Sequence, residues 1–180
     1  MILDKREWLL LRLQDVLRTL APGVVYTFPD RLPHRTIVSD LGRRVYSKVR
    51  SQARTDADEM PYVEILTSGH GPDAVQPLDS DLYAADLKVE VYGYVKADDQ
   101  ADSLDAVVRQ KLNDLRADLI VAVEAFPYWT DATHPEPATS VLGPIEPVLV
   151  SQFTEPAGDW PDGFLVLEFQ IRYLFNRKNP

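Results

Sequence analysis

The amino-acid sequence predicts a single α+β domain, in which two helices pack on one face of a mainly antiparallel sheet of about four to five strands. Residues 104–126 repeat apolar side chains at three- and four-residue steps, which is typical of one face of a helix. Residues 87–95 and 164–175 alternate apolar and polar side chains, as strands with one buried face do. The chain has 180 residues, 45% of them hydrophobic, which is enough for one sizeable core. We therefore expect one domain over residues 1–180.

The longest predicted element is the helix over residues 104–126. At a rise of about 1.5 Å per residue it would be roughly 34 Å long, so it would cross a whole small domain. Pro127 ends it. Its apolar face is expected to lie against the sheet and consists of Leu104, Val108, Leu112, Leu115, Leu119, Val123 and Phe126.

A second helix is predicted over residues 5–20, and Pro22-Gly23 breaks it. Trp8 and Leu11 fall on the side of the helical wheel away from the core stripe. Two explanations stay open for them: a loop of the same chain covers them, or they contact another subunit, where exposed Trp is enriched. The core stripe itself consists of Leu9, Leu13, Val16, Leu17 and Leu20.

The sequence predicts five strands. Pro147 indicates an edge or strand-start position for one of them. Between the strands we expect loops over residues 67–81, 127–144 and 155–163. Around Leu41, Val45 and Val49 the spacing fits either a short helix or a strand. The expected strands are residues 24–28, 61–66, 87–95, 145–153 and 164–175.

Charge is distributed unevenly, although the chain as a whole carries −9. A long connection is expected over residues 29–60, and within it residues 31–54 carry seven basic side chains and one acid, Asp40. This segment has a net charge of +6, which leaves −15 for the rest. Three interpretations stay open: a solvated arm, docking onto acidic surfaces of neighbouring copies, or contact with nucleic acid. The basic residues are Arg31, Arg35, Arg43, Arg44, Lys48, Arg50 and Arg54.

The sequence contains no recognisable catalytic or metal-binding motif. It has no cysteine, and its three histidines, His34, His70 and His134, lack metal-ligand spacing. The segment from Ser68 to Gly71 lacks the Gly-x-Ser-x-Gly elbow of a serine hydrolase. No apolar run approaches the ~18 residues of a membrane span. We therefore predict a non-enzymatic protein without cofactor or metal, made in the cytoplasm and not bound to a membrane.

Several segments together resemble a known family. The first helix contains KREWLLLRL, a later strand reads KVEVYGYV, the long helix contains LNDLRADLIVAV, and the closing strand ends RYLFNRKNP. In order and type they resemble the tail terminator proteins of long-tailed bacteriophages, the minor-tail or tail-completion class. The resemblance implies an α/β fold and a ring, usually hexameric, that caps the finished tail tube. The connections at 29–60 and 127–144 depart from the family pattern.

The resemblance also implies partners and a location in the virion, at its tail or neck. A terminator ring would contact copies of itself, the tail tube protein and the neck or head-completion protein, and DNA only as it passes through the ring. Two other hypotheses stay open: a neck or head-completion protein that contacts the portal complex and DNA, and a small hydrolase using His70. Candidate apolar anchors for subunit contacts are Trp8, Leu11, Tyr128, Trp129 and Trp160, with Ile120 and Val121 on the long helix.

Overall fold

The protein folds into two α-helices, a short 3-10 helix and one six-stranded sheet within the residues that the structure describes. The structure is a computed structural model, and it describes residues 5–26, 28, 35–41, 44–46, 60–67, 74–79, 81–96, 104–128, 145–156 and 162–176. The helices are α1 (Lys5–Arg18), α2 (Leu104–Ala125) and η1 (Phe126–Tyr128). The strands are β1 (Val45–Tyr46), β2 (Tyr62–Thr67), β3 (Ala74–Pro77), β4 (Leu82–Lys96), β5 (Glu146–Pro156) and β6 (Asp162–Asn176).

The sheet is built on the pairing of its two longest strands. β4 and β6 run antiparallel along their whole length, from Leu82 opposite Asn176 to Lys96 opposite Asp162. The strand order is β1-β2-β4-β6-β5, and β3 also pairs with β4. Only the β1–β2 pair is parallel. The predicted α+β class with a mainly antiparallel sheet is confirmed, and the sheet has two short strands, β1 and β3, beyond the expected set.

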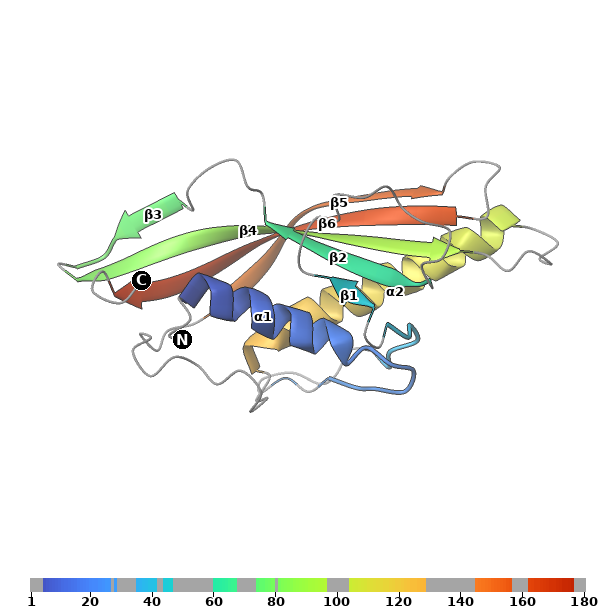
Figure 1. Ribbon diagram of the computed structural model, residues 1–180, viewed down its shortest axis with the longest axis horizontal. Helices are drawn as coiled ribbons and strands as arrows, with labels where there is room; N and C mark the ends of the chain where they lie inside the picture. The colour runs from blue at the N-terminus through green and yellow to red at the C-terminus, as the bar shows by residue number, and fades with distance from the viewer. Residues whose placement is uncertain are drawn as a thin grey trace.

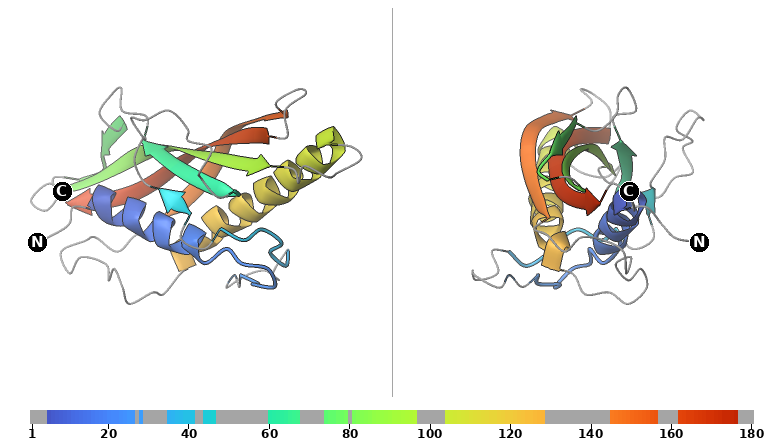
Figure 2. Two further views of the ribbon diagram at one scale, coloured as in Figure 1. Left: turned by 45° about the vertical axis from the view of Figure 1, so that its right-hand side comes forward. Right: turned by 90° about the vertical axis from the view of Figure 1, so that its left-hand side faces the viewer.

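Both helices lie on the same side of the sheet, and α2 crosses it diagonally (Figures 1 and 2). α2 packs on β4, β5 and β6, while α1 packs beside α2 and β1. The predicted apolar stripe of α2 is buried from Val108 to Phe126, and the inward side chains of β4 and β6 complete the core. The inward strand residues are Leu87, Val89, Val91 and Val95 on β4 and Leu165, Leu167, Phe169 and Ile171 on β6.

Two glycines let α2 approach the sheet closely. A Cβ atom at Gly163 would lie 2.5 Å from Val108 Cγ1 and 2.9 Å from a methyl group of Leu112. A Cβ atom at Gly93 would lie 2.9 Å from Leu115 Cδ2. A side chain at either position would therefore force the neighbouring side chains of α2 to move.

Several predicted boundaries change. The described residues of the predicted strand 24–28 form no strand but a single bridge, between Val25 and Thr36. The open choice near residue 45 resolves as the short strand β1, and the expected loop 67–81 contains β3. α1 ends two residues earlier than predicted. β5 occupies one end of the strand order, as Pro147 indicated.

Candidate functional site

One buried carboxylate binds residues 35–39 of the basic segment to the middle of α2. Asp118 is fully buried, and its Oδ1 accepts a hydrogen bond from Arg35 Nε at 2.6 Å. Its Oδ2 accepts bonds from the backbone N–H groups of Val38, at 3.0 Å, and Ser39, at 2.8 Å. Three donors from one segment far from α2 in sequence thus satisfy one buried charge, which is the condition for burying it at all. Residues 35–41 are thereby held against the helix.

Arg35 is shared between two carboxylates. Its Nη2 lies 2.7 Å from Asp114 Oδ1, next to the bond to Asp118. Hydrogen bonds to Asp118 and then to Asp114 raise the pKa of Arg35 above its usual value. Burial alone would raise the pKa of Asp114, but hydrogen bonds from Gln110 and Arg35 outweigh it and lower that pKa. Arg35 is therefore neutralised inside its own chain.

Arg44 also turns toward its own segment. Its guanidinium donates to the backbone carbonyls of Asp40 and Leu41 and lies 3.9 Å from Asp40 Oδ1. Of the three interpretations left open for the segment, a solvated arm is disfavoured for Arg35 and Arg44, because Arg35 binds two carboxylates and Arg44 binds two carbonyls of the same chain. The other predicted basic contacts, Arg31, Arg43, Lys48, Arg50 and Arg54, lie outside the described residues.

Some of the apolar anchor candidates are buried by their own chain and others are exposed. Trp8 is fully buried, with Lys5 Nζ 4.7 Å and the guanidinium carbon of Arg12 5.1 Å from its ring centroid. Its assignment to a subunit contact is wrong, because its own chain covers it. Leu11 is half-buried, and Tyr128 is 49% exposed at the end of η1.

The two candidates on α2 differ. Val121 is buried by its own chain, whereas Ile120 packs partly buried against the core. Trp129 and Trp160 lie outside the described residues.

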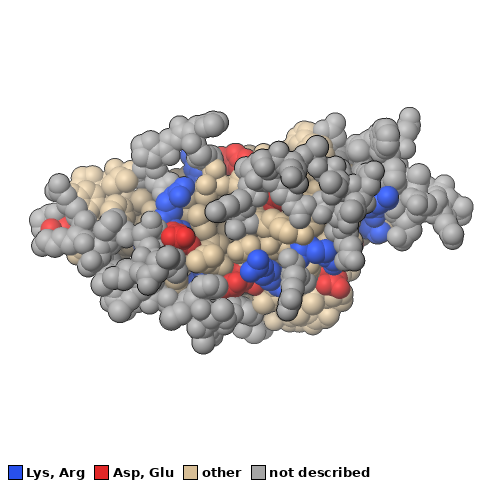
Figure 3. All heavy atoms as spheres, viewed as in Figure 1, with Lys and Arg blue, Asp and Glu red and all other residues tan. Residues whose placement is uncertain are grey.

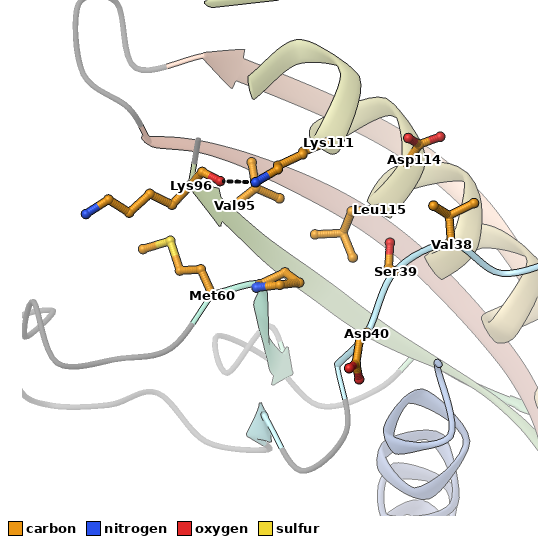
Figure 4. Close-up of a pocket in the computed structure, with 10 residues that line it drawn as sticks. Val38, Ser39, Asp40, Met60, Val95, Lys96, Lys111, Asp114 and Leu115 are labelled. Carbon is orange, nitrogen blue, oxygen red and sulfur yellow. Dashed lines mark hydrogen bonds between the residues drawn. The ribbon is translucent and has the colours of Figure 1, made fainter. Parts of the chain in front are cut away.

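A pocket of about 250 Å³ opens beside the fastened segment (Figure 4). Asp40 and Ser39 line one side, Lys96 comes from the end of β4, and Lys111 and Asp114 come from α2. Lys111 Nζ donates to the backbone carbonyl of Lys96 at 2.8 Å. Cationic and anionic groups are balanced here. Among the residues that the structure describes, no group of three His, Cys, Asp or Glu side chains could hold a metal ion.

The face of the sheet opposite the helices carries a row of aromatic rings that crosses five strands. Tyr46 meets Tyr62 edge-on at 6.3 Å between ring centroids, and Tyr62 stacks on Tyr94 at 4.5 Å. Phe164 follows at 6.5 Å from Tyr94, and Phe153 at 5.9 Å from Phe164. Cross-strand aromatic pairs of this kind stabilise a sheet, so the row ties β1, β2, β4, β6 and β5 together.

Strand β5 exposes several large apolar side chains. Val148, Val150 and Phe153 are 57%, 54% and 53% exposed, and the register with β6 shifts by one residue at Val150. Beside them, Glu90 and Glu168 stand directly opposite each other on β4 and β6. These five residues are called the β5 patch below. Large exposed apolar side chains grouped on one strand mark a contact surface more often than a solvated one.

Hydroxyl groups are the hydrogen-bond partners of the two glutamates. Tyr92 Oη donates to Glu90 Oε2 and Ser151 Oγ donates to Glu168 Oε2, each at 2.9 Å. The bond to Glu90, with burial as the next cause, raises the pKa of Tyr92. In the view of Figure 3, the basic and acidic side chains of the described residues lie interspersed.

Comparison of the sequence with protein-family models and with curated proteins finds no match. Within the described residues, neither helix is long and apolar enough to cross a membrane. The function therefore has to be argued from the order of elements and from the surfaces.

Proposed function

We propose that this protein is a structural virion component of a long-tailed bacteriophage, a tail terminator whose copies form a ring, with six as the expected number. The ring caps the finished tail tube and gives the head, through its neck, a surface to join. The observation that supports this proposal is the order of elements. A leading helix, a sheet strand reading KVEVYGYV, one long helix and a closing strand pair follow one another as in the terminator family.

A hydrogen-bonded network of charged side chains inside the subunit also supports a structural role. Asp118, Arg35 and Asp114 form a network that joins the basic segment to α2. Each described member of this network has its partners inside the chain. A network of this kind holds a shape, and a ring subunit needs a fixed shape to present its contact surfaces.

The ring would bind the tail tube protein on one side and the neck or head-completion protein on the other, and DNA would pass through it. The competing function is a neck or head-completion protein, which would bind the portal complex first. Co-sedimentation of the purified protein with tail tubes and, separately, with portal complexes distinguishes the two. We expect pelleting with tubes alone. Pelleting with portal complexes alone would support the neck function instead.

A further inference from the structure

We propose that copies of this chain associate head to tail, with Arg116 of one copy bound to the facing carboxylates of Glu90 and Glu168 in the next. The inference rests on the proposed ring and names the two surfaces that would close it. Arg116 lies on α2, in the helical layer. Glu90 alternates with the inward Val89 and Val91 on β4, so the two glutamates lie on the sheet face opposite the helices.

Arg116 is a cation whose hydrogen bonding is incomplete. Its Nε is the one buried side-chain donor, within the part of the chain that the structure describes, that has no hydrogen-bond partner. Its guanidinium also forms no ion pair with a described residue, and the side chain as a whole is half-buried. A buried donor without a partner destabilises a protein, and more so when it belongs to a charged group. A carboxylate brought by a second copy would satisfy it.

Arg116 lies on the flank of α2 that turns away from residues 35–39. Two residues along an α-helix differ by about 200° in direction, so Arg116 points away from Asp118, which binds that segment. Ile120 follows one turn later, shares the flank of Arg116 and is partly buried. This flank therefore offers a cation next to an apolar side chain.

The facing carboxylates lack a cation. Glu90 and Glu168 stand directly opposite each other on β4 and β6, and like charges so placed destabilise a sheet. Their hydrogen-bond partners are the hydroxyls of Tyr92 and Ser151, and neither carboxylate forms an ion pair with a described residue. Lys88, two residues from Glu90 on the same face, is exposed and pairs with neither. Arg116 of a neighbouring copy would supply the missing cation.

The two surfaces are unlike, which favours a head-to-tail contact over a two-fold one. Both helices lie on one side of the sheet (Figure 2), and the glutamates face the other side. A contact between unlike surfaces repeats from copy to copy and closes a ring when the rotation returns to the first copy. One guanidinium can bind two carboxylates at once, as Arg35 does with Asp114 and Asp118. Ile120 and the apolar side chains of the β5 patch would exclude water from the pair.

A reciprocal charge swap tests the proposal. The first chain carries Glu90→Lys with Glu168→Lys, the second carries Arg116→Glu, and the third carries all three changes. Association is measured by light scattering on a size-exclusion column, and circular dichroism checks folding. We expect the first two chains each to associate at least about tenfold more weakly than the wild type. Their equimolar mixture should regain the wild-type mass, because opposite charges meet at every contact of an alternating six-membered ring, and so should the third chain.

A neutral substitution separates association from folding. Arg116→Met keeps an unbranched side chain but removes the charge and the buried donor. At a concentration where the wild type is a single copy, its urea midpoint should not fall, because no described bond within the subunit is lost. Association should weaken about tenfold. The matched control, Lys96→Glu, changes an exposed cation at the end of β4 and should leave association unchanged.

Three outcomes would overturn the proposal. The wild type stays at the mass of one copy at every concentration, or the mixture of reversed chains fails to restore association. In the third, Lys96→Glu weakens association as much as Arg116→Glu does, which makes the effect one of overall charge. Rings that cap tubes but ignore the charge swap would remove this contact and leave the terminator function. Rings that obey the swap but bind no tube would do the reverse.

Discussion

At the scale of single residues, Asp118 determines how the basic segment meets the rest of the chain. It lies in the apolar face of α2 next to Leu119, is fully buried and accepts three hydrogen bonds. Asp118→Asn keeps its size but removes its charge and turns one acceptor atom into a donor. We expect a loss of about 3 kcal/mol in the free energy of unfolding, measured in urea, because a buried ion pair loses one partner.

The matched control for this substitution is Asp114→Asn. Asp114 also binds Arg35, but its side chain is 26% exposed. Solvent screens this pair, so we expect a loss below about 1 kcal/mol. Equal losses for the two substitutions would contradict the assignment of Asp118 as the main fastening.

Asp114 also gives a prediction about pH. Its pKa in the folded protein is lowered, so the folded state favours the charged carboxylate. This contribution to stability is present above the unfolded pKa of about 3.9 and is lost as pH falls through the lower folded value. In urea titrations between about pH 6 and 3, Asp114→Asn should therefore lose less stability than the wild type. Parallel curves would contradict this.

The residues that the sequence did not reveal are those whose partners lie far along the chain. The apolar stripe of α2 could be read from spacing alone. The bond between Arg35 and Asp118 joins residues 83 positions apart, and no local pattern predicts it. One signal was present, since an Asp beside Leu119 on an apolar face requires a buried partner. The helical wheel placed Trp8 away from the core stripe, yet tertiary packing buries it. A helical wheel contains no information about tertiary contacts.

At the scale of elements, the closeness of α2 to the sheet depends on Gly163. Gly163→Ala places a methyl group 2.5 Å from Val108 Cγ1, too close for an ordinary van der Waals contact. We expect a loss of about 1–3 kcal/mol in the free energy of unfolding, from overpacking. The double substitution Gly163→Ala with Val108→Ala should lose less than the sum of the single losses. Additive losses would contradict direct contact.

Element length decided which parts of the fold could be predicted. β4, β6 and α2 each span more than one full repeat of their pattern, and their periodicity identified them. β1 and β3 span two and four residues, too few to show a period. Residues 24–28 have the composition of a strand, and Tyr26 and Phe28 are buried, but the described residues there make a single bridge. Strand propensity alone does not form a strand where no neighbouring strand pairs with the segment.

At the scale of the whole molecule, the proposed ring needs two different complementary surfaces on each copy. If charge carries part of the contact, association should weaken steeply with ionic strength, because about 1 M salt shortens the screening length to roughly 3 Å. We expect the average mass in light scattering to fall between about 0.1 M and 1 M salt. A mass that rises or stays constant would indicate a purely apolar contact.

The central claim is that this chain forms the ring that ends a tail tube. Electron microscopy of purified tail tubes, with and without the added protein, tests it most directly. The account predicts an extra ring of density at one end of each tube, built of six copies, and no density along the tube wall. Tube ends that look the same with and without the protein would contradict it.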